Sequence, residues 1–207
     1  MNMKKALLIF AREPIPGLVK TRLAVSIGND AAAGLYANML QDVLDISRQL
    51  RGIEPIIFWD CEEEALPLLA ERYRCNSRRQ QSGDLGQRMQ AAFEEMFSSG
   101  CDACCIIGSD SPDLPLAYLN EAFDRLTNGS ADTVFGPCRD GGYYLIGLRK
   151  MTPSLFSAIS WSTPRVLKQS LTAALQAGAD VFLLPEWYDI DTLDDLHALQ
   201  QRRLSAQ

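Results

Sequence analysis

Three cations lie close together in a short segment near the start of the chain. The segment from Ala11 to Arg22 contains Arg12, Lys20 and Arg22, and two prolines and Gly17 stiffen it. A diphosphate or triphosphate is bound by backbone N–H groups and by several positive charges held together. Each charge-assisted hydrogen bond contributes about 1.5–3 kcal/mol. The segment is therefore predicted to bind phosphate, and the alternative is a solvated basic loop.

Two acidic segments could supply the ligands of a divalent ion. Asp110 follows the apolar run that ends at Gly108, and Asp191 lies in the segment Asp189-Ile190-Asp191. Mg²⁺ and Mn²⁺ prefer oxygen ligands, and such ions bridge carboxylates to substrate phosphates. We expect Asp110 and Asp191 to hold Mg²⁺ or Mn²⁺, with Asp189 as the alternative second ligand. Acidic residues at these positions could instead only favour the starts of the helices that follow.

Two glycine-containing segments are candidates for the walls of a pocket. The first runs from Gly83 and Asp84 to Arg88, and the second contains Asp140, Gly141, Gly142 and Tyr143. Glycine has no Cβ, so a ligand can approach its backbone closely. The Asp140-Gly141 pair is also an ordinary β-hairpin signal, so the second segment has a purely structural interpretation as well.

The elements that must position these residues alternate along the chain. Short apolar runs alternate with helical periodicity, which predicts an α/β fold of three layers with a mostly parallel sheet. Ligands of such sheets bind beyond the carboxyl ends of the strands, where the candidate residues lie. The hairpin around Gly141 predicts a small antiparallel insertion near the edge of the sheet. Strands are expected at 5–10, 55–59, 103–108, 132–136, 143–148 and 181–184, and helices at 29–50, 62–73, 85–96, 115–126, 163–175 and 192–203.

Composition restricts the class of protein further. The 207 residues show no linker or repeat, so residues 1–207 are expected to form a single domain. The net charge of -6 argues against a nucleic-acid partner, and no apolar run is long enough to span a membrane. The six cysteines form no regular framework, and Cys101, Cys104 and Cys105 are accompanied by only one histidine, so a structural metal is disfavoured. Reduced thiols and a cytoplasmic location are expected.

Five segments, taken in order, resemble a known family. The chain is similar to bacterial GT-A-like proteins that are related to the nucleotidyltransferases of molybdenum-cofactor and phospholactate metabolism. Members have been labelled radical-SAM/selenodomain-associated transferases or arsenosugar-biosynthesis glycosyltransferases. One departure is that Arg12-Glu13-Pro14 stands where typical nucleotidyltransferases begin with Gly-Gly-x-Ser. The segments that carry the resemblance are 16–23, 83–89, 108–115, 140–147 and 189–192.

The resemblance implies a Rossmann-like, nucleotide-binding GT-A fold and a role for each segment. It makes Asp110 and Asp191 the metal ligands, and it places the segment that begins at Gly83 at the nucleobase. It also places the Asp140 turn at the acceptor or sugar. Our hypothesis is that Lys20, Arg12 and Arg22 grip the phosphates, that Asp84 and Arg88 contact base or ribose, and that Asp140 and Tyr143 face the acceptor.

Three functions are compatible with these residues. The leading interpretation is glycosyl transfer from a nucleotide-sugar to a small acceptor, with Lys20, Asp110 and Asp140 as the catalytic residues. Asp140 would be the general base if the reaction inverts. The alternative is nucleotidyl transfer from a nucleoside triphosphate to a phosphorylated small molecule, with release of pyrophosphate. A non-catalytic nucleotide-sensing module is the third. The oligomeric state stays open.

Overall fold

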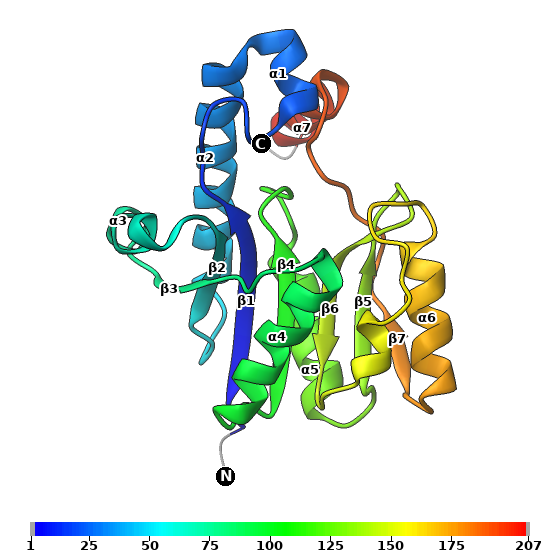
Figure 1. Cartoon of the computed structure of the whole chain (residues 1–207). Coiled ribbons are helices and arrows are strands. Elements are labelled where there is room, and N and C mark those ends of the chain that lie inside the picture. Colours follow the sequence, from blue (N-terminus) through cyan, green and yellow to red (C-terminus); the bar gives the residue numbers. More distant parts are fainter. Residues whose placement is uncertain (1–2, 206–207) are drawn as a thin grey trace.

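The computed structural model describes residues 3–205 and is built on one central sheet (Figure 1). Within these residues the sheet has seven strands in the order β3-β2-β1-β4-β6-β5-β7. The strands are β1 (Lys5–Arg12), β2 (Pro55–Asp60), β3 (Asn76–Arg79), β4 (Ala103–Gly108), β5 (Thr133–Pro137), β6 (Tyr143–Leu148) and β7 (Val181–Leu183).

In the described part of the chain, β6 is the one strand that runs opposite to the others. It pairs antiparallel with β4 and with β5, whereas the other neighbouring strands pair in parallel. The expected α/β fold with a mostly parallel sheet and a small antiparallel insertion is therefore confirmed. The insertion was expected near the edge of the sheet, but β6 lies inside it, because the short turn after β5 returns the chain to the gap between β5 and β4.

The helices cover both faces of the sheet. They are α1 (Thr21–Ile27), α2 (Asn29–Ser47), α3 (Leu66–Tyr73), α4 (Leu85–Ser98), α5 (Leu116–Thr127), α6 (Val166–Gln176) and α7 (Leu193–Ser205), with short 3-10 turns η1 (Glu63–Ala65) and η2 (Pro153–Phe156). Leu7 and Ile9 of β1 pack with α2, α3 and α5, whereas Leu8 packs with α4, α6 and η2 on the opposite face. This alternation along β1 produces the three layers, because successive strand side chains point to opposite faces.

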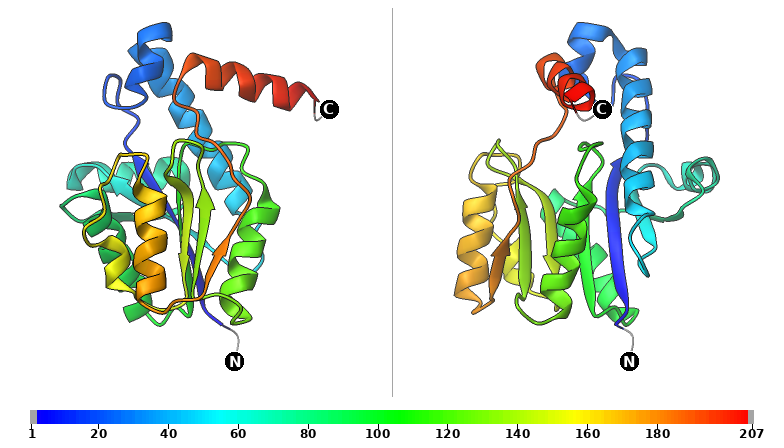
Figure 2. Two further views of the ribbon diagram at one scale, coloured as in Figure 1. Left: turned by 90° about the vertical axis from the view of Figure 1, so that its right-hand side faces the viewer. Right: turned by 180° about the vertical axis from the view of Figure 1, so that it is seen from behind.

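A small lobe lies beyond the carboxyl ends of the strands. Figures 1 and 2 show α1, the first half of α2 and α7 above that edge of the sheet. A separate apolar cluster holds this lobe together: Val19, Ala33, Tyr36, Met39, Ile190 and Leu199 are all buried in it. The lobe therefore joins the segment before α1 to the segment before α7, although about 170 residues separate them in the sequence.

Three elements were not expected from the sequence: β3, α1 and η2. β3 has the sequence Asn-Ser-Arg-Arg and is mostly exposed at the edge of the sheet, so it lacks the apolar alternation that predicts a strand. α1 has only 7 residues, fewer than a periodic pattern needs. No helix within residues 3–205 is long and apolar enough to cross a membrane.

Candidate active site

A cavity of about 540 Å³ lies at the carboxyl ends of β1, β2 and β4, below the lobe. Its position is the one that parallel α/β sheets offer to ligands. The polar residues that line it come from the ends of β1, β2 and β4 and from the segment after β3. Others come from α1 and the residue before it, from α2 and α4, and from the segments before α6 and α7. They are Arg12, Lys20, Thr21, Arg22, Tyr36, Asp60, Gln80, Arg88, Ser109, Asp110, Ser162 and Asp191.

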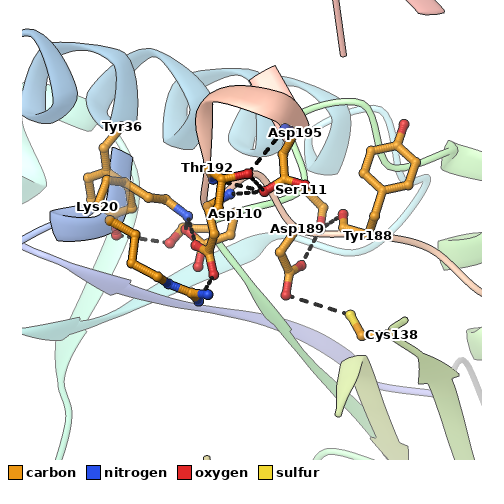
Figure 3. Close-up of polar contacts among 12 residues, drawn as sticks. Lys20, Tyr36, Asp110, Ser111, Cys138, Tyr188, Asp189, Thr192 and Asp195 are labelled. Atoms are coloured by element: carbon orange, nitrogen blue, oxygen red, sulfur yellow. Dashed lines mark hydrogen bonds and ion pairs between the residues drawn. The ribbon is translucent and has the colours of Figure 1, made fainter. Parts of the chain in front are cut away.

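Lys20 lies between the two carboxylates that were predicted to bind a metal ion. Its Nζ is 2.8 Å from Asp110 Oδ1 and 2.8 Å from Asp191 Oδ1, so the two oxygens are no more than twice that distance apart (Figure 3). The Lys20 side chain is only 4% exposed. Arg22 donates a further hydrogen bond of 2.5 Å to Asp191 Oδ2. The structure thus brings together four of the predicted residues from three separate segments.

The pKa of Lys20 depends on a competition between burial and charge. Burial lowers the pKa of this ammonium, but the charges of Asp110 and Asp191 and hydrogen bonds to both raise it above its ordinary value. Lys20 is therefore a permanent cation at neutral pH. Its backbone has φ 48 and ψ 44, a left-handed conformation, at the position just before α1.

Asp191 is positioned by the start of α7. Asp195 Oδ2 accepts hydrogen bonds from the backbone N–H of Asp191 (3.1 Å) and of Thr192 (2.8 Å), and the Thr192 hydroxyl also donates to it. The Asp195 N–H in turn donates to Thr192 Oγ1, which makes a reciprocal cap of the helix. One residue before Asp191, the N–H of Ile190 donates to the Asp110 carbonyl over 2.9 Å and fixes the two acidic segments side by side.

Tyr36 links the cation loop to the end of β4. Its hydroxyl accepts a hydrogen bond from the backbone N–H of Arg12 (2.9 Å) and lies 2.9 Å from Ser109 Oγ. Burial, and then the charge of Asp110, raise the pKa of this hydroxyl, so it stays protonated. Tyr36 was not predicted as a site residue, because a tyrosine on the apolar face of a helix has the pattern of an ordinary core residue.

The far end of the cavity carries a second polar group, formed by Arg12, Asp60, Gln80 and Arg88. Arg88 Nη1 lies 3.1 Å from Asp60 Oδ2 and donates to Gln80 Oε1 over 2.9 Å. The Gln80 amide donates to the carbonyls of Ala11 and Phe58, which fixes its orientation. Asp60 and Gln80 were not predicted, although Asp60 directly follows the predicted strand 55–59 and the rule applied to Asp110 would have found it.

Gly83 and Asp84 do not appear in the described lining of this cavity. Asp84 caps α4: its Oδ1 accepts from the Gln87 N–H, and Gln87 Oε1 accepts from the Asp84 N–H, both over 2.9 Å. Gly83 lies against the same Gln87 side chain. Helix capping thus accounts for both residues. Gly17 also lies outside the lining residues, in the turn that leads to Lys20.

The Asp140 turn lies outside the cavity lining too. Asp140 Oδ1 accepts a hydrogen bond of 2.9 Å from the Gly142 N–H and so stabilises its own turn, and the Asp140 side chain is exposed. The Gly141 carbonyl accepts from the N–H of Leu167, which docks the turn on the start of α6. The Tyr143 ring packs on Phe135 and its hydroxyl oxygen is buried, so it does not face a solvent-accessible acceptor site.

Asp189 is half-buried beside the site, and none of its described hydrogen bonds involves Lys20 or Arg22. It accepts a hydrogen bond from Ser111 Oγ over 2.9 Å, and Cys138 Sγ lies 3.6 Å away (Figure 3). Burial, and then the charge of Asp110, raise the pKa of Asp189 to about 6. Asp191 is therefore better placed than Asp189 to pair with Asp110 at the cavity.

The paired carboxylates fit a particular kind of metal site. Asp110 Oδ1 lies 2.8 Å from Lys20 Nζ, and no other described residue donates a hydrogen bond to it, so loss of this one contact would free the oxygen for another cation. No group of three or more potential metal-binding side chains occurs in the described part of the chain. Mg²⁺ is commonly held by one or two carboxylates together with substrate phosphates. The donor set fits an ion shared with phosphates, and not one enclosed by protein ligands alone.

Comparison with known proteins gives matches at the level of family and fold. The model of a family described as "Uncharacterized protein conserved in bacteria (DUF2064)" matches residues 43–163. A crystal structure described as a "putative nucleotide-diphospho-sugar transferase", from Desulfovibrio desulfuricans, is 35% identical, with a TM-score of 0.91. The match covers 97% of this chain and 88% of that chain. Among curated proteins, none matches the chain.

More distant structures share the fold. One is CMP:2-keto-3-deoxy-manno-octonic acid synthetase complexed with CTP, at 13% identity and a TM-score of 0.63, with 99% of this chain and 100% of that chain covered. Another is Rv0371c of Mycobacterium tuberculosis in complex with manganese, at 15% identity and a TM-score of 0.57, with 97% and 100% covered. These similarities establish the nucleotide-diphospho-sugar transferase fold that the motifs predicted.

Proposed function

The chain belongs to the bacterial DUF2064 family, and we propose that it is a metal-dependent transferase that moves a glycosyl group from a nucleotide-sugar to a small acceptor. The proposal depends above all on one observation. Lys20, Asp110 and Asp191 meet within hydrogen-bonding distance in a cavity that also presents Arg12, Arg22 and Arg88. Cations and paired carboxylates in one cavity are what a nucleotide diphosphate and a divalent ion require.

Within the proposed reaction, Lys20 and Arg22 bind the phosphates of the donor, and Asp110 and Asp191 hold Mg²⁺ or Mn²⁺. When bound, the ion neutralises the charge that develops on the diphosphate leaving group. Arg12 and Arg88, oriented by Asp60, contact the nucleoside at the far end of the cavity. Asp60 and Gln80 hold Arg88 in place, so this cation is positioned before a ligand binds, which favours electrostatic stabilisation of a transition state.

The charges on the acceptor side favour glycosyl transfer to an uncharged hydroxyl. Asp189 and Asp140 lie toward β5 and β6, while Arg139 there is already paired with Glu186 over 3.2 Å. A phosphorylated acceptor would be repelled by these carboxylates, whereas a hydroxyl group can donate to one of them. Asp140 keeps the role of general base in this proposal, since its side chain is exposed and is held only by its own turn.

Nucleotidyl transfer from a nucleoside triphosphate is the second candidate. The group of cations around Lys20 supports it, because a triphosphate carries more charge than a diphosphate. A distant structural neighbour, CMP:2-keto-3-deoxy-manno-octonic acid synthetase, is described as complexed with CTP. A third candidate, a non-catalytic nucleotide sensor, needs only the binding cavity. It differs from both enzymes in having no turnover.

A thermal-shift panel tests whether this cavity binds nucleotides. Nucleotide-sugars and nucleoside triphosphates are added with and without Mg²⁺ or Mn²⁺, and a ligand at a hundredfold excess over its Kd stabilises by about 2.7 kcal/mol. We expect a nucleotide-sugar to raise the Tm only with the ion, and Asp110→Asn to abolish the rise. Asp124→Asn, on the exposed face of α5, is the matched control and keeps it. An unchanged shift in Asp110→Asn would overturn the proposed site.

Product analysis then separates the three candidates. With an active acceptor, a glycosyltransferase releases a nucleoside diphosphate or monophosphate, whereas a nucleotidyltransferase releases pyrophosphate. A sensor binds the same ligand but leaves it intact. Release of pyrophosphate would replace our leading proposal by the second candidate, and binding without turnover over a broad acceptor panel would replace it by the third.

A further inference from the structure

We infer that Lys20 is an internal counter-ion that holds the Asp110–Asp191 pair until nucleotide phosphates attract its ammonium, so that a divalent ion binds together with the nucleotide and not before it. The inference rests on the proposed function, because it assigns an order of binding to the same cavity. It concerns what Lys20 does in the free protein, in addition to its role as a phosphate ligand.

The Lys20 ammonium lies between the two carboxylates. Lys20 Nζ is 2.8 Å from one oxygen of each carboxylate, and its side chain is 4% exposed. A divalent ion that used Asp110 and Asp191 as joint ligands would need the space between them. In the free protein, that space is taken by a cation that belongs to the chain.

The charges of the side chains around Lys20 balance one another. Two cations, Lys20 and Arg22, face two carboxylates, Asp110 and Asp191, so this group is neutral by itself. A divalent ion added alone would leave an excess of positive charge in a half-buried site. Phosphates that arrive with the ion supply the missing negative charge, so binding of the two should be mutually favourable.

Lys20, and not Arg22, is the counter-ion of the two carboxylates. The Arg22 side chain is 72% exposed, and among the described ion pairs it contacts Asp191 alone, through Oδ2. Among the described ion pairs, Lys20 bridges both carboxylates, with one oxygen of each 2.8 Å from its Nζ. A ligand that attracts the ammonium away therefore frees both carboxylates together.

The side chain of Lys20 can move. Its side chain ends in a compact ammonium on a flexible four-carbon stem, so Nζ can turn from the carboxylates to a phosphate without moving α1. The left-handed backbone at Lys20 (φ 48) is uncommon for a residue other than glycine, and it aims the side chain into the cavity from the start of α1. The exchange requires a change of side-chain rotamer only.

Binding of Mn²⁺ to the wild-type protein tests the inference without any variant. The spin-resonance signal of free Mn²⁺ is measured with protein alone, and then with protein plus the nucleotide selected by the thermal-shift panel, after subtraction of the nucleotide-only mixture. We expect the nucleotide to tighten Mn²⁺ binding to the protein by at least tenfold. Equal Mn²⁺ affinity with and without nucleotide would overturn the inference.

Substitution of Lys20 provides the matched test. Lys20→Met removes the ammonium and keeps an unbranched side chain, so Mn²⁺ alone should bind on the order of tenfold more tightly than in the wild type. Arg22→Met, which leaves the bridge in place, should still bind Mn²⁺ weakly without nucleotide. Lys150→Met, at an exposed lysine paired with Asp132, controls for the loss of one positive charge. Weaker Mn²⁺ binding in Lys20→Met would contradict the counter-ion role.

Failure of the inference can be told apart from failure of the proposed function. A protein that binds no nucleotide under any condition contradicts the proposed function. A protein that binds nucleotide but takes up Mn²⁺ equally well without it contradicts only the order of binding. Thermal unfolding of each variant shows whether it is folded, and the wild-type measurement stands whether or not Lys20→Met folds.

Discussion

At the scale of single residues, the hydroxyl of Tyr36 joins two parts of the site that are remote in sequence. It contacts the backbone N–H of Arg12 at the end of β1 and the Ser109 hydroxyl after β4. The contact with Ser109 is buried and the contact with the Arg12 N–H is partly buried, so the Ser109 hydroxyl would lose its partner if the Tyr36 hydroxyl were removed. Tyr36 thereby fixes the start of the cation loop relative to Asp110.

Tyr36→Phe should lower the free energy of unfolding by about 1–3 kcal/mol, because it removes the hydrogen-bond partner of the buried Ser109 hydroxyl and of the Arg12 N–H. Tyr73→Phe is the matched control: the Tyr73 hydroxyl is buried but has no hydrogen-bond partner among the described residues. That change should be close to neutral. Urea unfolding of the two variants measures the difference in the free energy of unfolding. An equal decrease in both variants would show that the hydrogen bonds of Tyr36 do not stabilise the protein.

The backbone conformation and the packing both require glycine at position 141. Its φ is +89, and a Cβ built on it would lie 2.2 Å from the Pro164 carbonyl oxygen. Gly28 has a similar φ of +86 but no atom within 4 Å of such a Cβ. The pair separates the cost of the backbone conformation from the cost of the clash.

Gly28→Ala should lower the free energy of unfolding by roughly 1–2 kcal/mol, the cost of a left-handed conformation with a Cβ. Gly141→Ala should lose about 1–3 kcal/mol more, because the turn must move away from α6. Chemical denaturation of both variants checks the ranking. Loss of stability in Gly141→Ala no greater than in Gly28→Ala would mean that the turn does not pack against Pro164.

Some site residues could be predicted from the sequence and others could not, for physical reasons. Asp110 was predicted because an aspartate just past an apolar strand is well placed for ligands, and Lys20 because three cations lie in one short loop after the first strand. Tyr36 was missed because its position on the apolar face of α2 predicts only packing. Gly83 and Asp84 were assigned to the nucleobase, whereas their contacts in the structure are those of a helix cap.

At the scale of elements, the start of α7 determines where Asp191 points. Asp195 accepts hydrogen bonds from the backbone of Asp191 and Thr192, and so couples the cap of the helix to the proposed ligand. Asp194 lies next to it in the first turn and is exposed. Both acidic residues favour the helix N-terminus through their charge, but the described hydrogen bonds to the cap come from Asp195.

Asp195→Ala should therefore cost about 1 kcal/mol more in the free energy of unfolding than Asp194→Ala, since each removes one charge but only the first removes the cap. Asp195→Ala should also weaken nucleotide binding in the presence of Mg²⁺, although Asp195 does not line the cavity. Chemical denaturation and ligand titration of the two variants test this. Equal nucleotide affinity in both would show that Asp191 does not depend on the cap.

Elements with strong periodicity or caps were predictable, and weakly patterned ones were not. β4 was expected at 103–108 and is found there, because six residues from Ala103 form a nearly continuous apolar run. The polar edge strand β3 and the single short helix α1 form only in the context of the whole fold. β3 is stabilised by parallel pairing with β2, which no local pattern reveals.

At the scale of the whole molecule, the lobe of α1, α2 and α7 turns an open sheet edge into a cavity. Figure 2 shows α7 returning to the same end of the molecule as α1 after the chain has passed through all the strands. The buried contacts among Val19, Tyr36, Ile190 and Leu199 bring Lys20 and Asp191 together. The sequence could predict that Lys20 and Asp191 each lie at this edge of the sheet. It could not predict their direct contact, because the apolar cluster of the lobe determines the distance between them.

The most direct test of the account is a crystal structure with Mn²⁺ and the nucleotide selected by the thermal-shift panel, with the metal located by anomalous scattering. We predict a manganese peak bonded to both Asp110 and Asp191, with the phosphates in contact with Lys20 and Arg22. Manganese bound away from both carboxylates, or a nucleotide whose phosphates contact neither cation, would contradict the account.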